Sequence, residues 1–206
     1  MKKILSLTVL GMMTVGTANA GMAVNVLGGM NYNKNSESPA TAGQTTSAKG
    51  ALSYGASFEF GVVPMFGVEV GVLSVGKSNK IDTGATGSAV STIRAIQIPV
   101  MLRFTALPIL DFGIGGYYGS SAKKYKISES TIAGVPDGSY DVDSAAYESS
   151  DFGARASLRA KFPVAPMIGI LLDVNYSMGL KDLDKSSATT EKTREFALLA
   201  GASFGF

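Results

Sequence analysis

The chain has 206 residues, of which 46% are hydrophobic, and it contains 25 glycines but no cysteine and no histidine. The missing cysteine excludes disulfide bonds and a lipid-modified cysteine, and the missing histidine excludes active sites that need an imidazole as base. Lys2 and Lys3 account for the excess of 18 basic over 16 acidic side chains, so the rest of the chain is neutral and its charge gives no support for nucleic-acid binding.

The first 20 residues have the three parts of a secretory signal peptide. A basic pair opens them, an apolar stretch too short to span a bilayer follows, and Ala18-Asn19-Ala20 has the small-x-small form that signal peptidase cleaves. We therefore expect an exported protein in which residues 1–20 are a signal peptide and residues 21–206 form one domain.

Apolar and polar residues alternate along most of the remaining chain. Between residues 51 and 61, for example, Leu52, Tyr54 and Phe58 share one parity, whereas Ser53 and Glu59 share the other. Such a period of two is typical of β-strands whose two faces meet different environments. It recurs in eight segments, each about the length that a tilted strand needs to cross a bilayer. They are residues 24–32, 51–61, 66–72, 96–104, 110–118, 152–162, 168–177 and 195–206.

The connections between these segments differ in length. Three are tight, at residues 62–65, 105–108 and 163–166, and they alternate with long polar ones such as 34–50 and 120–150. Short turns at one rim and long loops at the other are typical of outer-membrane barrels. The sequence therefore predicts an all-β fold, a closed eight-stranded antiparallel transmembrane β-barrel in up-and-down order, with its apolar face toward lipid. A ten-stranded barrel that uses the 120–150 loop, and a soluble carrier barrel with the apolar face inside, stay open.

The chain ends in the apolar stretch LLAGASFGF, with Phe204 and Phe206 on the lipid-facing parity. In lipid, every backbone N–H and C=O must be paired, so the last strand has to close the barrel against the first. We therefore expect both termini at the rim that carries the short turns.

The segment IQIPVMLRFTALPILDFGIGGYYG and the terminal FGF resemble the small eight-stranded outer-membrane barrels of the OmpA- and OmpX-like group. The resemblance implies a bacterial outer-membrane location with periplasmic termini, and recognition of Phe204 and Phe206 by the barrel-assembly machinery. It also implies contact with membrane lipid and lipopolysaccharide, whose phosphates Arg94 would reach from the apolar parity. Because tryptophan is absent, the interfacial girdle would consist of Tyr32, Tyr54, Phe66, Phe104, Tyr118 and Tyr176.

A set of charged residues lies on the parity expected to face the barrel interior. It consists of Glu59, Glu69, Arg103, Asp111, Arg155, Arg159, Asp173 and Glu195. Because an eight-stranded barrel has room only for its own side chains, these charges must find partners. The expected turn positions give three facing pairs: Glu59 with Glu69, Arg103 with Asp111, and Arg155 near Asp173. Arg103 would be shared among several carboxylates.

The 120–150 loop is basic in its first part and acidic in its last part. We expect its arms to continue the neighbouring strands as a hairpin beyond the membrane, with a turn at residues 135–138. Its exposed edge is a candidate site for an extracellular partner that adds a strand. Asp137, Asp141 and Asp143 are a weaker candidate for calcium, because the glycine and glutamate spacing of a calcium loop is missing.

These expectations support two functions. The favoured one is a non-enzymatic outer-membrane barrel that contributes to envelope structure or contacts partners through its extracellular loops. The alternative is a small low-conductance pore gated by its lumen salt bridges. An enzyme is disfavoured because the known lipases and proteases of this architecture use serine–histidine or aspartate–histidine pairs, and no cofactor or metal site is expected.

Overall fold

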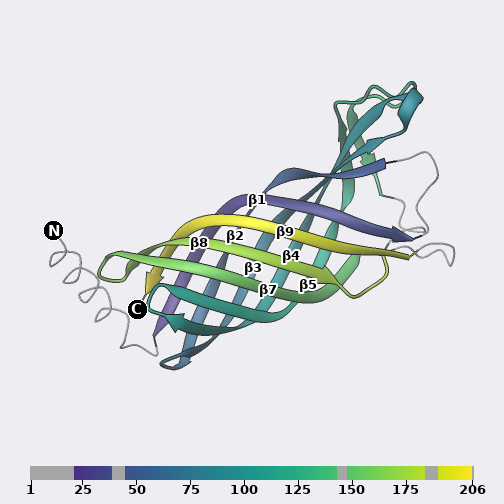
Figure 1. Ribbon diagram of the computed structural model, residues 1–206. Coiled ribbons are helices and arrows are strands. Elements are labelled where there is room, and N and C mark those ends of the chain that lie inside the picture. Colours follow the sequence, from purple (N-terminus) through teal and green to yellow (C-terminus); the bar gives the residue numbers. More distant parts are fainter. Residues whose placement is uncertain (1–20, 39–44, 143–147, 184–189, 206) are drawn as a thin grey trace.

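The computed structural model describes residues 21–38, 45–142, 148–183 and 190–205, and these ranges form a set of long antiparallel strands (Figure 1). The strands are β1 (Met22–Ser38), β2 (Thr45–Val63), β3 (Phe66–Asp82), β4 (Ser88–Leu107), β5 (Leu110–Ser128), β6 (Gly138–Asp141), β7 (Ser150–Ala165), β8 (Ile168–Gly179) and β9 (Thr190–Gly205). No helix among the described residues has the length and apolarity to cross a membrane. The predicted signal peptide, residues 1–20, lies outside the described ranges.

Eight of these strands form a closed ring. Each pairs antiparallel with the next along the chain, apart from β6, and the pairing of β1 with β9 completes the circle. The short strand β6 lies outside the ring and pairs with the far end of β5. The predicted eight-stranded up-and-down barrel is therefore confirmed, and the ten-stranded alternative is wrong for the described part of the chain.

The ring is strongly staggered. A line of paired residues that starts at Ala23 and passes once around the ring returns to β1 at Asn33, ten positions further along. A stagger of this kind accompanies the strand tilt of about 35–45° that closed barrels show. The oblique strands of Figure 1 follow from it.

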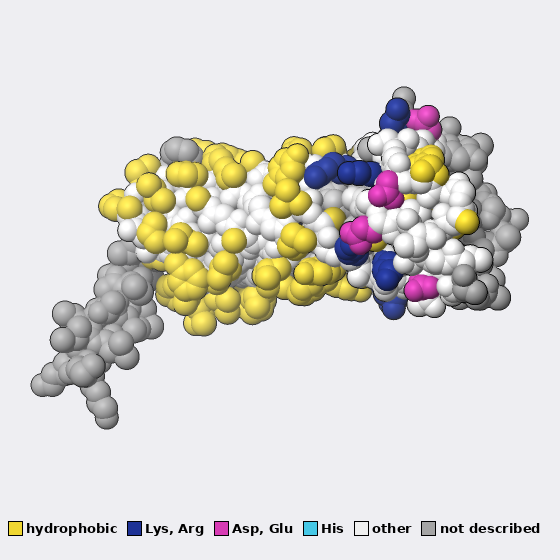
Figure 2. All heavy atoms as spheres, turned by 90° about the horizontal axis from the view of Figure 1, so that it is seen from above, with side chains coloured by type: hydrophobic (Ala, Val, Ile, Leu, Met, Phe, Trp, Pro, Cys, Tyr) yellow, Lys and Arg dark blue, Asp and Glu magenta, His cyan; other side chains and the backbone are white. Residues whose placement is uncertain are grey.

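The two faces of the wall match the predicted alternation. Apolar side chains point outward, and Leu102 and Ile114 are 61% and 68% exposed. Exposed apolar side chains lie on all eight strands of the ring, and on the face shown in Figure 2 they form a band, whereas charged side chains gather toward one end. Polar side chains such as Asn25 and Gln97 point inward and are fully buried. An apolar exterior around a polar interior excludes the soluble carrier barrel and fits a surface that is covered by lipid.

All three predicted short turns are present. They lie at residues 64–65, 108–109 and 166–167, at one end of the barrel. The long connections are shorter than predicted, because the strands continue beyond the apolar band; only residues 83–87 separate β3 from β4. The alternation does not mark these extensions because the outward positions there are largely polar, as at Ser78, Lys80 and Asp82 of β3.

The extension of β5 forms one arm of a hairpin, as predicted, but the other arm is the separate strand β6 and does not continue β7, which begins at Ser150. Lys124 to Ile127 pair with residues 138–141, and the rings of Tyr125 and Tyr140 stack at 5.7 Å between centroids. The predicted turn at 135–138 is wrong, because Gly138 already belongs to β6 and the tight turn lies at residues 133–134.

The seam between β1 and β9 joins the two ends of the chain. Ala23 pairs with Gly205, and Phe204 lies between Val24 and Ile168, with its side chain partly exposed on the outer face. This rim also holds the three short turns (Figure 1). Phe206 lies outside the described residues. Of the two aromatic residues predicted to face lipid at this end of the chain, the structure therefore describes only Phe204.

Candidate functional site: two ion-pair clusters in the lumen

Charged and polar side chains fill the barrel interior in two clusters. The lower cluster, nearer the short turns, consists of Glu59, Glu69, Arg103, Ser157, Arg159 and Asp173. The upper cluster, nearer the long loops, consists of Lys77, Gln97, Tyr117, Asp151, Arg155, Ser177 and Glu195. All of them occupy inward positions of the strand alternation, and all but Glu59 are buried.

Arg159 lies at the centre of the lower cluster. Its Nε donates to Oδ2 of Asp173 at 2.6 Å, and Nη1 and Nη2 donate to the two carboxylate oxygens of Glu69 at 2.9 and 3.0 Å. Nη1 also lies 3.5 Å from Oε2 of Glu59. The predicted facing pair of Glu59 and Glu69 is confirmed, and this guanidinium compensates the repulsion between them.

Arg103 provides the second cation of the lower cluster. Its Nε donates to Oε2 of Glu69, and its Nη1 donates to Oγ of Ser157 at 2.6 Å. Its Nη2 lies 3.4 Å from Oδ2 of Asp173. The expected sharing of Arg103 among several carboxylates is therefore confirmed. A Cβ on Gly113 would overlap Arg103 and Ser157, so glycine leaves the space that the guanidinium occupies.

Glu195 is the main acceptor of the upper cluster. Its Oε1 lies 2.7 Å from Nζ of Lys77, and its carboxylate accepts hydrogen bonds from Nε2 of Gln97 at 3.0 and 3.2 Å. The amide oxygen of Gln97 in turn accepts from Nη2 of Arg155. Gln97 thus connects a buried anion to a buried cation.

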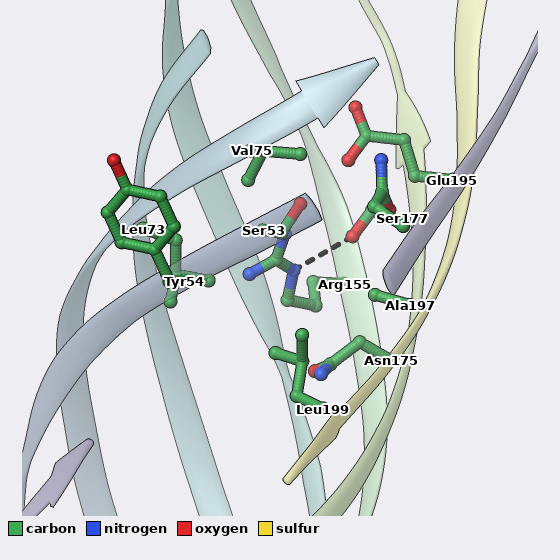
Figure 3. A pocket seen from close by; sticks show the side chains of 11 residues that line it. Ser53, Tyr54, Leu73, Val75, Arg155, Asn175, Ser177, Glu195, Ala197 and Leu199 are labelled. Carbon is green, nitrogen blue, oxygen red and sulfur yellow. Dashed lines mark hydrogen bonds between the residues drawn. The ribbon is translucent and has the colours of Figure 1, made fainter. Parts of the chain in front are cut away.

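A second chain of contacts completes the upper cluster. The Tyr117 hydroxyl donates to Oδ2 of Asp151 at 2.8 Å, and Lys77 lies 3.8 Å from the same oxygen. The Arg155 guanidinium lies 5.5 Å from the centroid of the Tyr117 ring, and its Nε donates to Oγ of Ser177 at 2.8 Å (Figure 3). Hydrogen bonds and a cation–π contact therefore supplement the ion pairs.

Several of these contacts cross the lumen instead of following the wall. The Arg159–Glu69 pair joins β7 to β3, the Arg103–Asp173 pair joins β4 to β8, and the Lys77–Glu195 pair joins β3 to β9. None of these strand pairs are neighbours in the ring. The contacts therefore connect opposite parts of the wall and obstruct the space between them.

The free space beside the upper cluster is small. A cavity next to Arg155 and Glu195 is lined on its other sides by Leu73, Val75 and Leu199 (Figure 3). The volume that the centre of a water molecule can occupy in this cavity is about 10 Å³, which is room for roughly one water. Leu27, Leu171 and Leu199 pack together as an apolar cluster. Apolar side chains and ion pairs together fill this part of the barrel.

The predicted pair of Arg103 with Asp111 is wrong. Asp111 faces Thr105, and Arg103 bonds across the lumen instead. The turn lies at Pro108–Ile109, and β4 carries a bulge at Ala106, so the register differs by two residues from the expected one. Asp111 is buried near the short turns.

The predicted proximity of Arg155 and Asp173 along the β7–β8 ladder is also wrong. Asp173 faces Arg159, four residues further along β7, and Arg155 faces Ser177. The turn was expected between Val164 and Ala165, whereas it lies at residues 166–167 and follows a bulge in β7. A register shift by an even number of residues leaves each side chain on its predicted face of the strand. The predicted inward direction of Arg155 and Arg159 is therefore still correct.

Five members of the upper cluster were absent from the predicted lumen set: Lys77, Gln97, Tyr117, Asp151 and Ser177. Lys77 follows Glu69 at an even spacing on β3, and Asp151 precedes Arg155 at an even spacing on β7. Extending the alternation past the apolar stretch would have placed both side chains inside. Gln97 and Tyr117 were passed over because neither carries a charge.

The candidate calcium ligands do not converge. The Asp137 carboxylate accepts hydrogen bonds from the backbone N–H groups of Glu129 and Ser130, and Asp141 lies 3.8 Å from Nζ of Lys124. Asp143 lies outside the described residues. Among the residues that the structure describes, no group of three or more acidic side chains is placed to hold a metal ion.

Comparisons with known proteins agree with this architecture. No curated protein sequence matches the chain significantly. Among solved structures, it is similar to the outer membrane protein OprG from Pseudomonas aeruginosa, with 12% identity, a TM-score of 0.57, and coverage of 93% of this chain and 98% of that chain. It is also similar to the outer membrane protease OmpT from Escherichia coli, with 11% identity, a TM-score of 0.55, and coverage of 90% and 97%. At these identities the likeness is one of fold.

A family model assigns the chain to a protein family, which similarity of fold alone does not do. The model described as the outer membrane protein beta-barrel domain matches residues 17–185, which is most of the chain. The chain therefore belongs to the outer membrane protein beta-barrel domain family.

Proposed function

We propose that the protein is a non-enzymatic barrel of the bacterial outer membrane whose lumen is sealed by its own ion pairs. The barrel body then has a structural role in the envelope, and contacts with partners are made at the long-loop end. The observation that carries the proposal is the set of ion pairs that cross the lumen between non-neighbouring strands. Buried pairs of this kind are costly to separate, which supports a closed state.

A gated pore is the second candidate, and one observation favours it. Oδ1 of Asp151 and Oδ1 of Asp173 are buried and have no hydrogen-bond partner among the described residues. Buried carboxylate oxygens are normally paired or hydrated. A rearrangement that satisfied them would change the ion pairs that cross the lumen, and such a change could open a narrow path.

The non-enzymatic part of the proposal rests on the chain's chemistry. OmpT is a protease, but the likeness to it extends only to the fold. The sequence contains no histidine to serve as a general base. Arginines engage Glu69 and Asp173, and Lys77 engages Glu195 and Asp151, which leaves these buried carboxylates unsuited to proton transfer.

The orientation in the membrane belongs to the same proposal. We place the short-turn rim, with β1's start and β9's end, in the periplasm, and the long-loop end outside the cell, as is usual for bacterial barrels. The β5–β6 hairpin is then extracellular, and the edge of β6 that pairs with no strand among the described residues is available for strand addition by a partner. The barrel-assembly machinery would act on the β9 terminus.

A liposome-swelling assay tests the sealed lumen. Vesicles that contain the refolded protein are expected to swell in a small uncharged sugar at the rate of empty vesicles, because the space beside Arg155 admits about one water. A general porin serves as the positive control. Swelling that increases with the amount of folded protein would contradict the sealed lumen and favour the pore.

A further inference from the structure

The barrel wall has an irregularity where β2 and β3 leave the apolar band. The ladder between them is regular up to Tyr54 and Ser74, and it resumes at Lys49 and Ser78. Between these pairs, four residues of β2 face three residues of β3. This β-bulge turns the two strands relative to each other and interrupts their backbone hydrogen bonds.

Side chains from the lumen take over the missing backbone bonds. The N–H of Gly76 donates to Oγ of Ser53 at 3.0 Å, and the carbonyl of Gly76 accepts from Nδ2 of Asn31 at 2.9 Å. A Cβ on Gly76 would lie within 2.8 Å of atoms of Ala51 and Leu52. The bulge is therefore fixed from the inside and packed closely.

A cavity of about 270 Å³ adjoins this bulge. It opens outward, since exposed side chains such as Leu52 and Arg94 form part of it. We call it the wall notch; its lining includes Lys49, Leu52, Ser78, Thr92, Arg94 and Glu129. Its volume far exceeds the roughly 10–15 Å³ that a single water needs, so it can accept a group of several heavy atoms.

The charge of the wall notch comes from Arg94. Lys49 and Glu129 neutralise each other through an ion pair of 2.6 Å. The Arg94 guanidinium donates to Oγ of Ser74 at 3.3 Å and lies 5.6 Å from the centroid of the Tyr54 ring. It has no carboxylate partner within ion-pair distance among the described residues. The notch therefore presents one uncompensated cation.

The position of the wall notch matches the border of the apolar band. Leu52 and Tyr54 lie at its lower edge, Ile96 lies directly below it, and all three are about half exposed. In Figure 2, Lys and Arg side chains gather where the apolar band ends. A cation and a tyrosine at this level meet the headgroup region of a bilayer, whereas the side chains below meet acyl chains.

We propose that the wall notch binds the phosphate group of a membrane lipid in the leaflet at the long-loop end. Arg94 provides the charge and a planar set of donors that suits a phosphate. The hydroxyls of Ser78 and Thr92 share a hydrogen bond of 2.8 Å, which leaves one hydroxyl hydrogen for a bound oxygen. The acyl chains then lie along the apolar band below. The proposal concerns the outer wall and is independent of whether the lumen conducts.

Native mass spectrometry of the refolded protein in mixed micelles tests this site. The probe is phosphatidic acid, titrated against the wild type, Arg94→Gln and Arg194→Gln. Arg194 is the matched control, because it is exposed on β9 two residues beyond the exposed Phe196, as Arg94 lies two residues beyond Ile96. We expect binding of one lipid to weaken about tenfold in Arg94→Gln and to change less than twofold in Arg194→Gln.

Two further arms identify the source of the phosphate. Diacylglycerol with the same acyl chains is expected to show no specific binding, and millimolar inorganic phosphate is expected not to displace the lipid. Arg94→Lys, which keeps the charge, is expected to retain more binding than Arg94→Gln, and gel mobility before and after heating checks that each variant is folded. Equal binding by the wild type and Arg94→Gln, equal binding of diacylglycerol, or full displacement by inorganic phosphate would overturn the proposal.

Discussion

Replacing Arg159 with alanine is expected to lower the free energy of unfolding by about 3–5 kcal/mol. The side chain is 1% exposed and bonds to both Glu69 and Asp173, while it also lies near Glu59. Its removal leaves an excess of buried negative charge with Arg103 as the one remaining cation of the lower cluster. Urea titration of the refolded protein in lipid vesicles, followed by gel mobility, measures the change.

An exposed ion pair provides the control for Arg159. Lys124 and Asp141 lie 3.8 Å apart on the β5–β6 hairpin, and both side chains are largely exposed. Lys124→Ala is therefore expected to change the free energy of unfolding by less than about 0.5 kcal/mol. If Arg159→Ala were no more destabilising than Lys124→Ala, the lower cluster would not stabilise the barrel.

Gly201→Ala is expected to cost about 3 kcal/mol or to prevent refolding. Gly201 is an inward position of β9, and a Cβ there would overlap the carbonyl oxygen of Val26 on β1. This seam closes the ring, so neither strand can move away without breaking its ladder to the other neighbour. The fraction that refolds and the urea midpoint are the quantities to measure.

Gly28→Ala is the matched variant on the same seam. Gly28 pairs with Ala200, the neighbour of Gly201 on β9, but a side chain at position 28 would point outward. The nearest atoms to a Cβ at Gly28 lie 3.9 Å away, which is ordinary contact. We expect Gly28→Ala to refold like the wild type. Equal behaviour of the two variants would contradict the close approach of β1 and β9 at Gly201.

The alternation of residues was sufficient to predict the fold. Side chains such as Phe58 and Leu102 point to lipid, and Glu59 and Arg103 point to the lumen, because parity alone determines the face of a strand. The placement of short turns then determined the order of the strands. Inward glycines such as Gly113 follow from the same alternation, since the lumen is too crowded for larger side chains at every position.

The register of the lumen pairs could not be predicted in the same way. Bulges at β4 and β7 each add a residue that no local pattern marks, and they displaced the partners of Asp111 and Asp173. Contacts across the lumen, such as Arg159 with Glu69, depend on the stagger of the whole ring. Counting residues from each expected turn aligns only neighbouring strands, so it cannot predict these contacts across the lumen.

The polar ends of the strands were missed for a different reason. Beyond the apolar band the outward positions of the strands are largely polar, so the apolar–polar alternation disappears although the ladder continues. Lys77 on β3 lies at this transition and was therefore left out of the lumen set. Its ion pair with Glu195 shows that the polar interior reaches further toward the long loops than the sequence indicated.

Single-channel recording in planar bilayers tests the sealed lumen most directly. The refolded wild type is compared with Arg103→Ala, which removes the contacts of this side chain to Glu69 and Asp173. A sealed lumen predicts a silent bilayer for wild-type protein that is shown to be folded and inserted. Discrete openings of the wild type, with a conductance or open time that changes in Arg103→Ala, would contradict it and would establish a pore gated by the lumen charges.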